Sequence, residues 1–564
     1  MSFSPFSIVF EPCHDSGNLV LAPETAGAAG RGGGRPGFSV PKPPFTRSTS
    51  YNSEFSSSTC GSLTDASSPP ASSPSLGGLD SPTFGQDDDF RFDNGLDSLC
   101  RIKANFSQAL PTDGIPYNLD PPRIESLRVV IIGGGIAGLA TAIACARQGL
   151  SVIVLERSTI RSNFGDSIVI GSNASLLLNR WGIVDEMNES LTKDKYWVVH
   201  DDQGRELHRE DLKLIAEKYG SPVLQGKRSQ FTRVMDQEAR RLGVDFRYDA
   251  EVTGYSDSQI KPGVILKGGE MVRGDVIVVC DGVRSTARRL MADKDSVSLP
   301  RKPSGYAIHR SIIATKKIKD DPVCSRLADG NIHFFLGDDC HAEVWPLDNG
   351  KQVAFTFTHL DSDGRSTLDW RCMTSIWTCL ELMKNWDPSL VAAVEKSPAT
   401  HHWTILADTV APSWVSKGRK IVFAGDAVHP LSPASFQAGT QAIEDGATIA
   451  LCLMLSGATP DRVPLALRVY EQLRRDRAEK AGELGRKQQE ILHSFVPIAR
   501  SKDPSQPRID PSSTLRPLNF EMYDFDAEAF AETHFDALAR EIELAEAKKG
   551  NARNYTSRYF AEGT

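Results

Sequence analysis

The stretch RVVIIGGGIAGLATAIACARQGLSVIVLER, residues 128–157, predicts a strand, a glycine-rich turn, a helix and a second strand. Its first apolar run, residues 129–132, is β-branched and too short for a helix, so it suits a parallel strand that is buried on both faces. The Ala-rich segment after the glycines has the length of a helix, and residues 151–155 form a second apolar run. This order of elements defines a βαβ unit.

Three glycines in the turn have the spacing of a dinucleotide-binding site. Gly133 permits the tight bend, Gly135 lets the backbone approach a pyrophosphate, and Gly138 brings the helix against the strand. The helix then points its positive N-terminus at the pyrophosphate. Glu156 ends the second strand and is placed to accept hydrogen bonds from an adenosine ribose. The glycine spacing alone is common by chance, and its position between strand and helix favours a nucleotide site over an ordinary turn.

Composition and charge fit a globular enzyme without a nucleic-acid or membrane partner. The chain has 564 residues, 40% of them hydrophobic, which suffices for several domains with a sizeable core. A net charge of -8 provides no general attraction to nucleic acid or anionic lipid. We find no run long enough to span a membrane and no basic region of a secretory signal. The 10 cysteines form no CxxC pair, which predicts reduced thiols and a cytoplasmic location.

Residues 1–122 differ in composition from the rest of the chain. Residues 30–37 read GRGGGRPG, and residues 47–83 are rich in serine with interleaved prolines and little apolar periodicity. Such a segment cannot bury enough apolar surface to offset the entropy lost on ordering. We therefore predict a disordered Ser/Pro/Gly-rich extension over residues 1–122.

Two further apolar strands each end in a turn that contains an aspartate. The first leads into CDGVRSTAR, residues 280–288, and the second into AGDAVHP, residues 424–430. Between them, residues 304–360 alternate as the strands of an antiparallel sheet do. Either aspartate alone could simply cap the next helix. Together with the glycine turn, the two motifs favour a nucleotide site built from three separate segments.

The three motifs, in this order, resemble those of the FAD-dependent aromatic-ring monooxygenases, the single-component flavoproteins that include salicylate and para-hydroxybenzoate hydroxylases. The resemblance covers about residues 127–500 and is to a fungal-type member. It implies an α/β fold: a glutathione-reductase-like FAD-binding Rossmann domain with an inserted antiparallel β-sheet substrate domain and C-terminal helices. The implied ranges are 127–298 and 405–460 for the FAD-binding domain, 299–404 for the substrate domain and 461–564 for the C-terminal helical region.

The resemblance also implies which residues contact FAD. The glycine turn would hold the ADP half of FAD, with Arg157 beside the adenine, and Arg228 would approach FAD from a helix. Asp281 and Gly282 are implicated in binding FAD and the reduced nicotinamide, and the Asp426 carboxylate would accept a hydrogen bond from the ribityl chain. The full set is Gly133, Gly135, Gly138, Glu156, Arg157, Arg228, Asp281, Gly282, Gly425, Asp426 and Gly439.

One loop departs from the family pattern. The family has Gly-Gln-Gly where this chain has Phe436, Gln437 and Ala438, and a glycine comes only at Gly439. The loop opens a long helix whose positive end would stabilise negative charge on the reduced flavin. Because glycine normally lets the backbone approach the flavin ring, Phe436 must point away from the flavin or form a wall of the substrate pocket. Our hypothesis is the wall, since an aromatic side chain suits an aromatic substrate.

Candidate catalytic residues lie on the inserted sheet. Arg310 resembles the arginine of the family's substrate domain, and Tyr306 and His309 are further candidates. The alternative role for Arg310 is an ion pair at the surface or between domains. His401 and His402 are adjacent and cannot easily face one metal ion, so the sequence predicts no metal site.

The sequence therefore predicts a monooxygenase that hydroxylates a small aromatic (phenolic) or secondary-metabolite substrate. As the resemblance implies, NADH or NADPH would reduce FAD, and O2 would give a flavin C4a-hydroperoxide that transfers its distal oxygen. Chemistry supplied by a cofactor fits the lack of a nucleophile–base signature. Three alternatives remain open: epoxidation or another oxidation on the same scaffold, a flavin-bound scaffold or sensor without turnover, and a nucleotide-binding module without flavin. The oligomeric state is not predicted.

Overall fold

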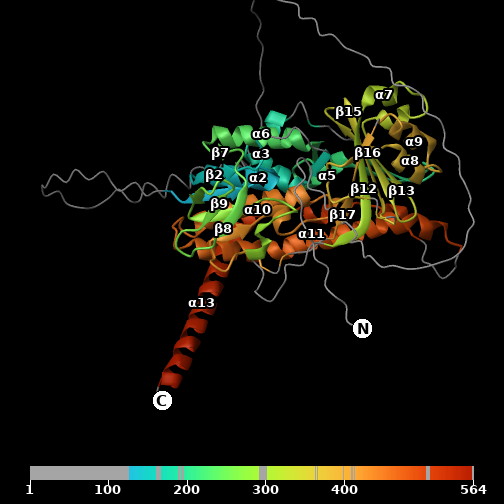
Figure 1. Ribbon diagram of the computed structural model, residues 1–564. Coiled ribbons are helices and arrows are strands. Elements are labelled where there is room, and N and C mark those ends of the chain that lie inside the picture. The colour runs from blue at the N-terminus through green and yellow to red at the C-terminus, as the bar shows by residue number, and fades with distance from the viewer. Residues whose placement is uncertain are drawn as a thin grey trace, which may run out of the picture. The chain divides into compact units, whose positions relative to one another are not determined.

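A computed structural model of the chain describes residues 126–159, 167–187, 191, 196–290, 302–362, 364, 366–397, 399–407, 411, 413–502 and 509–561. The predicted disordered extension lies outside these residues. The described part has the predicted α/β architecture, with a parallel sheet, a separate large sheet and long C-terminal helices (Figure 1).

The parallel sheet contains the predicted βαβ unit of residues 128–157. Its strand order is β18-β11-β1-β2-β7, and all neighbouring strands are parallel. Helix α2 connects β1 to β2 and is buried along most of its length. The elements are β1 (Arg128–Ile132), α2 (Ile136–Arg147), β2 (Ser151–Leu155), β7 (Asp245–Arg247), β11 (Val276–Val279) and β18 (Ile421–Phe423). Because parallel strands end at one edge, the turns after β1, β11 and β18 lie close together.

Small sheets and helices flank the parallel sheet. A two-stranded ribbon pairs β3 with β6, and a three-stranded meander has the order β10-β9-β8. Their bounds are β3 (Ser167–Ile170), β6 (Leu224–Lys227), β8 (Val252–Ser256), β9 (Gly263–Leu266) and β10 (Met271–Arg273), with helices α3 (Ser172–Arg180), α4 (Ile183–Met187) and α6 (Arg228–Arg241).

The large sheet has eight strands in the order β16-β17-β12-β15-β14-β13-β4-β5. All neighbours are antiparallel except β13 and β4, which are parallel. Strands β4 and β5 come from the range expected for the first part of the FAD-binding domain, well before residue 299. The strands are β4 (Tyr196–Asp201), β5 (Glu206–Asp211), β12 (Pro303–Ala314), β13 (Ile332–Leu336), β14 (His341–Leu347), β15 (Gln352–Leu360), β16 (Met373–Ser375) and β17 (Ala399–Leu406).

Both faces of the large sheet are covered. Phe335 and Phe357 pack with helices α7, α8 and α9 on one face, whereas Phe334 and Trp345 pack with α5 and α11 on the other. We call the first the outer face and the second the inner face. The covering helices are α5 (Leu212–Tyr219), α7 (Thr315–Lys319), α8 (Trp377–Leu382) and α9 (Pro388–Val394). Neighbouring residues of β13 therefore serve different cores, as the two-residue period of a strand requires.

Long helices connect the two sheets. Helix α10 (Ala438–Leu455) packs against α2, and α11 (Val463–Arg500) contributes Tyr470 to the core of the parallel sheet and Phe495 to the core of the inner face. Helices α12 (Pro511–Thr514) and α13 (Ala527–Ala561) follow, and short 3-10 turns include η3 (Gly425–Ala427), η4 (Pro433–Ser435) and η5 (Leu518–Met522). A single helix thus fixes the two sheets in one structural unit.

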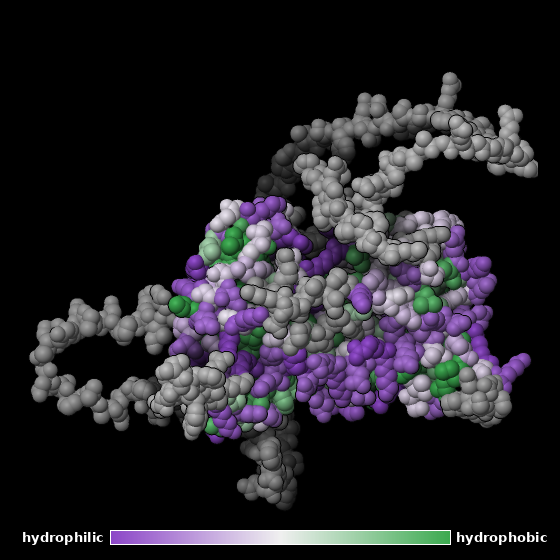
Figure 2. Space-filling model, turned by 60° about the horizontal axis from the view of Figure 1, so that its bottom comes forward, coloured by the Kyte–Doolittle hydropathy of each residue, from purple (hydrophilic) through white to green (hydrophobic). Residues whose placement is uncertain are grey.

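The face of the molecule in Figure 2 is mainly polar where the described residues are visible. Figure 2 shows hydrophilic residues over most of the face in view, and its hydrophobic areas are small and separate. Among the described helices, none combines the length and the low polarity that crossing a membrane requires. The cysteines of this part of the chain are free thiols.

Candidate cofactor and substrate site

The glycine turn after β1 has no room for side chains. Gly133 has φ +100°, and its backbone N–H donates to the carbonyl oxygen of Leu155 at 2.8 Å. A Cβ on Gly133 would lie 2.6 Å from the carbonyl oxygen of Cys280, and one on Gly138 would lie 1.9 Å from the carbonyl oxygen of Gly133. The close approach of backbone to backbone therefore requires glycine at both positions.

Two charged side chains flank this turn. The Glu156 carboxylate accepts hydrogen bonds from the backbone N–H of Gly134 at 2.8 Å and from that of Ser158 at 2.9 Å. Arg228 begins α6, and its Nη2 lies 3.9 Å from the position that a Cβ on Gly135 would take. The space in front of Gly135 thus has a guanidinium on one side and the helix N-terminus on the other, which suits a pyrophosphate. Arg157 is exposed next to Glu156.

The second motif follows β11. Burial raises the pKa of the Asp281 carboxyl, and its Oδ1 has no hydrogen-bond partner among the described residues. Gly282 has φ +81°. Arg288 donates through Nε to the carbonyl oxygen of Ala427 at 2.8 Å and through Nη2 to that of Asp426 at 3.0 Å. The second motif is therefore hydrogen-bonded to the third.

The third motif lies against the starts of α2 and α10. Gly425 has φ +59°, and a Cβ there would lie 2.8 Å from the Cβ of Ala137 and 3.3 Å from that of Ala442. Its backbone N–H donates to Oδ2 of Asp445 at 2.8 Å. The three motifs, which lie between residues 133 and 430 of the chain, meet at one edge of the parallel sheet, as the sequence predicts.

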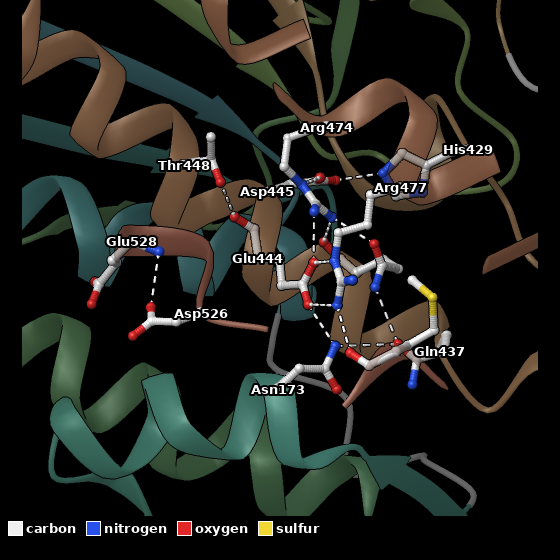
Figure 3. Close-up of polar contacts among 12 residues, drawn as sticks. Asn173, His429, Gln437, Glu444, Asp445, Thr448, Arg474, Arg477, Asp526 and Glu528 are labelled. Carbon is white, nitrogen blue, oxygen red and sulfur yellow. Dashed lines mark hydrogen bonds and ion pairs between the residues drawn. The ribbon is translucent and has the colours of Figure 1, made fainter. Parts of the chain in front are cut away.

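Buried charged side chains of α10 and α11 contact the third motif (Figure 3). Arg474 of α11 donates through Nε to Asp445 at 2.9 Å and through Nη1 to Glu444 at 2.6 Å. Arg477 binds the same Glu444 carboxylate with two nitrogens at 2.7 and 2.8 Å. His429 Nε2 lies 2.5 Å from Oδ2 of Asp445. We call these five residues the charge network.

The balance of charges in this network explains how it tolerates full burial. Burial alone would raise the pKa of the Glu444 carboxyl, but Arg477 and Arg474 hold that pKa below its usual value. Burial acts in the same way on Asp445, and His429 and Arg474 outweigh it. Each acid thus stays ionised because two basic side chains face it.

Sequence reasoning did not single out the charge network as a structural unit. A signal was present: Gln441, Glu444 and Asp445 are polar residues at helical spacing in an otherwise apolar helix, and Arg474 and Arg477 lie three residues apart in the next helix. Charged residues on a helix that reads as buried require partners of opposite charge.

The loop before α10 carries Phe436 away from the charge network and toward the inner face of the large sheet. Phe436 has φ +51°, a left-handed conformation that favours glycine. Its ring contacts Trp197, Phe334 and Trp345, with centroids 5.4, 6.0 and 5.8 Å away. We call these four residues the aromatic cluster. The backbone therefore keeps a glycine-like turn, while the side chain joins the sheet.

Gln437 and Gly439 lie beside this turn at the start of α10. The buried Oε1 of Gln437 accepts a hydrogen bond from Nε2 of Gln441 at 3.1 Å, and its Nε2 has no hydrogen-bond partner within the described residues. A Cβ on Gly439 would lie 2.8 Å from Cδ1 of Ile168 on β3. Among the described residues, the buried polar atoms near the motifs that lack a hydrogen-bond partner include this amide nitrogen and Oδ1 of Asp281, and a bound cofactor can satisfy them.

Arg310 and Tyr306 lie on the inner face, which also carries the aromatic cluster. Arg310 donates through Nε to Oγ1 of Thr356 at 3.2 Å and through Nη2 to Oγ of Ser167 on β3 at 3.3 Å. Since β3 also contacts Gly439, Arg310 faces the ribbon that borders the start of α10. The Tyr306 hydroxyl donates to Oδ1 of Asp339 at 2.6 Å.

His309 points the other way. Side chains alternate along β12, so His309 projects from the outer face, where it pairs across strands with Phe357 and His402. The structure therefore does not bring His309 together with Arg310 and Tyr306. The sequence places these three residues within five positions of one another and does not distinguish the two faces.

A chain of polar side chains on the inner face was not predicted. Glu343 accepts from Nε1 of Trp345 at 2.9 Å and lies 3.3 Å from His341, whose Nδ1 is 2.8 Å from Nε2 of His493. His493 lies 3.3 Å from Asp339, the partner of Tyr306. Burial and the adjacent His341 lower the pKa of His493 to about 2. Burial and Asp339 raise the pKa of Tyr306 to about 12, so its phenol is a donor at neutral pH.

The chain is similar to known FAD-dependent proteins. The family model described as FAD binding domain matches residues 126–484. Asperlicin C monooxygenase of Petromyces alliaceus is 31% identical over 370 residues, 64% of this chain and 79% of that protein. The crystal structure of CtdE in complex with FAD and a substrate is 27% identical, with a TM-score of 0.66 over 74% of this chain and 100% of that one. A substrate complex of salicylate hydroxylase shares the fold, with a TM-score of 0.61 at 19% identity over 74% of this chain and 98% of that one.

Proposed function

Because the chain belongs to the FAD-dependent aromatic-ring monooxygenase family, we propose that it hydroxylates a small aromatic, phenolic or secondary-metabolite substrate, with NADH or NADPH as reductant and O2 as co-substrate. The protein is a flavoprotein monooxygenase, and FAD is its cofactor. The observation that carries the proposal is that the three motifs meet at one edge of the parallel sheet. Next to them lies the inner face of the large sheet, with the Arg310 guanidinium and the aromatic cluster.

The cofactor-binding residues form one half of the proposed site. The turn at Gly133, Gly135 and Gly138 would accept the pyrophosphate, and Arg228 would neutralise part of its charge. Glu156 would accept hydrogen bonds from the ribose, and Arg157 would lie beside the adenine.

The second and third motifs complete this half. Asp281, with Gly282, brings a carboxylate oxygen that lacks a partner among the described residues, and Asp426 follows Gly425 in a turn that Arg288 holds. Bound FAD supplies the redox chemistry and the oxygen activation. The start of α10, at Gly439, would place its positive end near the flavin.

The substrate-binding residues form the other half. Arg310 would orient an anionic or phenolic substrate through charge-assisted hydrogen bonds. Tyr306 would donate or relay a proton, since it stays protonated at neutral pH. The aromatic cluster, with Phe436 at its edge, would form a wall for an aromatic substrate and exclude water from the reacting atoms. His309 has no part in this proposal, because it lies on the outer face.

A substrate screen tests the proposed function. Purified protein with FAD is mixed with NADH or NADPH and a panel of phenols and indoles, and oxygen uptake is recorded. We expect one class of aromatic compound to stimulate uptake. The variant Arg310→Met should retain FAD and lose this stimulation, whereas the control Lys319→Met, on the exposed surface of α7, should behave as the parent. If the protein holds FAD but none of the tested compounds makes it oxidise reduced nicotinamide, the result would instead support a flavin-bound sensor.

A further inference from the structure

Three histidines from neighbouring strands meet on the outer face of the large sheet. His309 lies on β12, His359 on β15 and His402 on β17, and β12 pairs with both of the other strands. His309 stands directly opposite His402 in the register. This outer face is separated by the sheet itself from Arg310 and the aromatic cluster, so the histidines do not belong to the proposed active site.

The three rings are close enough to share a ligand. Ring centroids of His309 and His402 are 3.9 Å apart, and those of His359 lie 5.2 and 5.4 Å from them. One nitrogen of each ring lies within 4.8 Å of one nitrogen of the others. A tetrahedral zinc site, with Zn–N distances of about 2.0–2.1 Å, needs these nitrogens about 3.3 Å apart. The rings of His309 and His402 are stacked with 4° between their planes, so metal binding requires at least one ring to rotate out of the stack.

The tautomer of His359 suits metal binding. Nδ1 of His359 lies 2.7 Å from the carbonyl oxygen of Leu360, and since a carbonyl can only accept, Nδ1 carries the proton and Nε2 carries the lone pair. A backbone carbonyl is a usual support for a metal-binding histidine.

His309 is a buried polar side chain. It is 1% exposed, and its Nδ1 has no hydrogen-bond partner in the described part of the chain. A buried ring nitrogen of this kind usually bonds to a protein group, a water molecule or an ion. Its neighbour His402 is only partly buried, which leaves an approach for an ion from the edge of the group.

We propose that His309, His359 and His402 form a zinc site, with water in the fourth position. Three neutral imidazoles with an open position are a known zinc ligand set, and imidazole also suits Cu²⁺ and Ni²⁺. Along the chain, β12 follows β11 of the parallel sheet and β17 precedes β18 of that sheet. Bound Zn²⁺ would fasten these two strands to each other and to β15.

The proposed site was not predicted from the sequence, where only His401 and His402 were considered as metal ligands. That interpretation considered the two adjacent residues, which point to opposite faces of β17. The structure pairs His402 with residues 93 and 43 positions earlier in the chain. No local spacing signal marks such a group, because the partners are set by strand register.

The test uses the FAD-loaded full chain. The protein is treated with a chelator, and Co²⁺, which reports tetrahedral coordination by its visible absorption, is titrated in before competition with Zn²⁺. We expect one tight equivalent of metal per chain and a higher thermal unfolding temperature with Zn²⁺. His402→Gln and His359→Gln should each weaken binding by at least about 10-fold, the lower end of what loss of a supporting partner costs metal sites.

Two matched variants serve as controls. His401→Gln alters the adjacent residue of β17 on the opposite face, and His534→Gln removes a histidine from α13, so both should bind Co²⁺ as the parent does. Flavin absorbance checks that each variant is folded. The proposal is overturned if the parent binds no metal, or if His402→Gln and the parent bind it equally well. If His359→Gln fails to fold, His402→Gln and the zinc-dependent unfolding temperature of the parent still decide.

Discussion

The cofactor side and the substrate side of the segment at residues 425–441 are stabilised by different physical means. On the cofactor side, glycines admit close backbone contacts, and the charge network fixes the third motif against α10 and α11. On the substrate side, Phe436 packs with tryptophans and another phenylalanine on a sheet face. Backbone geometry and ion pairs tolerate little change, whereas aromatic packing can accept other shapes. Damage to the first side should therefore cost folding and FAD, and damage to the second should alter substrate selection.

The largest effect is expected at Arg474. Arg474→Met would leave Glu444 and Asp445 buried with one cationic partner fewer, and removal of one member of a buried ion pair costs about 3–5 kcal/mol. Denaturant unfolding of the FAD-loaded protein measures this loss. The control is Arg468→Met on the same helix, whose partly exposed pair with Glu546 should be worth about 0–1 kcal/mol. Equal stabilities of the two variants would show that the charge network does not support the fold.

A smaller effect is expected at Glu156. Glu156→Ala removes the proposed acceptor for the ribose hydroxyls and the acceptor for the N–H of Gly134, and a hydrogen bond to a charged group contributes about 1.5–3 kcal/mol. The dissociation constant of FAD, measured by flavin fluorescence, should rise about 10- to 150-fold. Glu251→Ala removes an exposed pair with Lys267 and should leave FAD affinity unchanged. A variant at 156 that binds FAD as tightly as the parent would refute the placement of the ribose.

The smallest effect, and the sharpest contrast with the cofactor side, is expected at Phe436. Phe436→Gly suits the left-handed backbone and removes one ring of the aromatic cluster, so FAD should stay bound. Ring packing with a substrate is worth about 0.5–1.5 kcal/mol, which predicts a change in KM of about 2- to 12-fold or a changed substrate preference. Phe436→Tyr keeps a ring and serves as the control. Loss of FAD with an unchanged substrate profile would mean that Phe436 supports the cofactor instead.

The cofactor side could be predicted from the sequence because each of its motifs is local. Gly133 and Gly138 follow a buried strand directly, and the turns at Asp281 and Gly425 have the same context. The charge network was not predicted, although its acids and arginines have helical spacing. The reason is that neither the sequence of α10 nor that of α11 shows that the two helices pack together.

The substrate side could be predicted only in outline. The alternating pattern predicts the sheet, but not that β4 and β5 join it or that β13 runs parallel to β4. It also does not reveal that Arg310 and His309 face opposite ways, or that His309 meets two distant histidines. Strand register depends on contacts between segments far apart in sequence, and those contacts leave no local signature.

Oxygen labelling tests the proposed function most directly. The FAD-loaded protein is supplied with reduced nicotinamide, the aromatic compound selected in the screen and ¹⁸O2 in unlabelled water, and the product is analysed by mass spectrometry. A monooxygenase inserts one oxygen atom from O2, so the product should carry a single ¹⁸O on the aromatic ring. A product whose added oxygen comes from water, or an unmodified compound recovered while reduced nicotinamide is consumed, would contradict the proposed function.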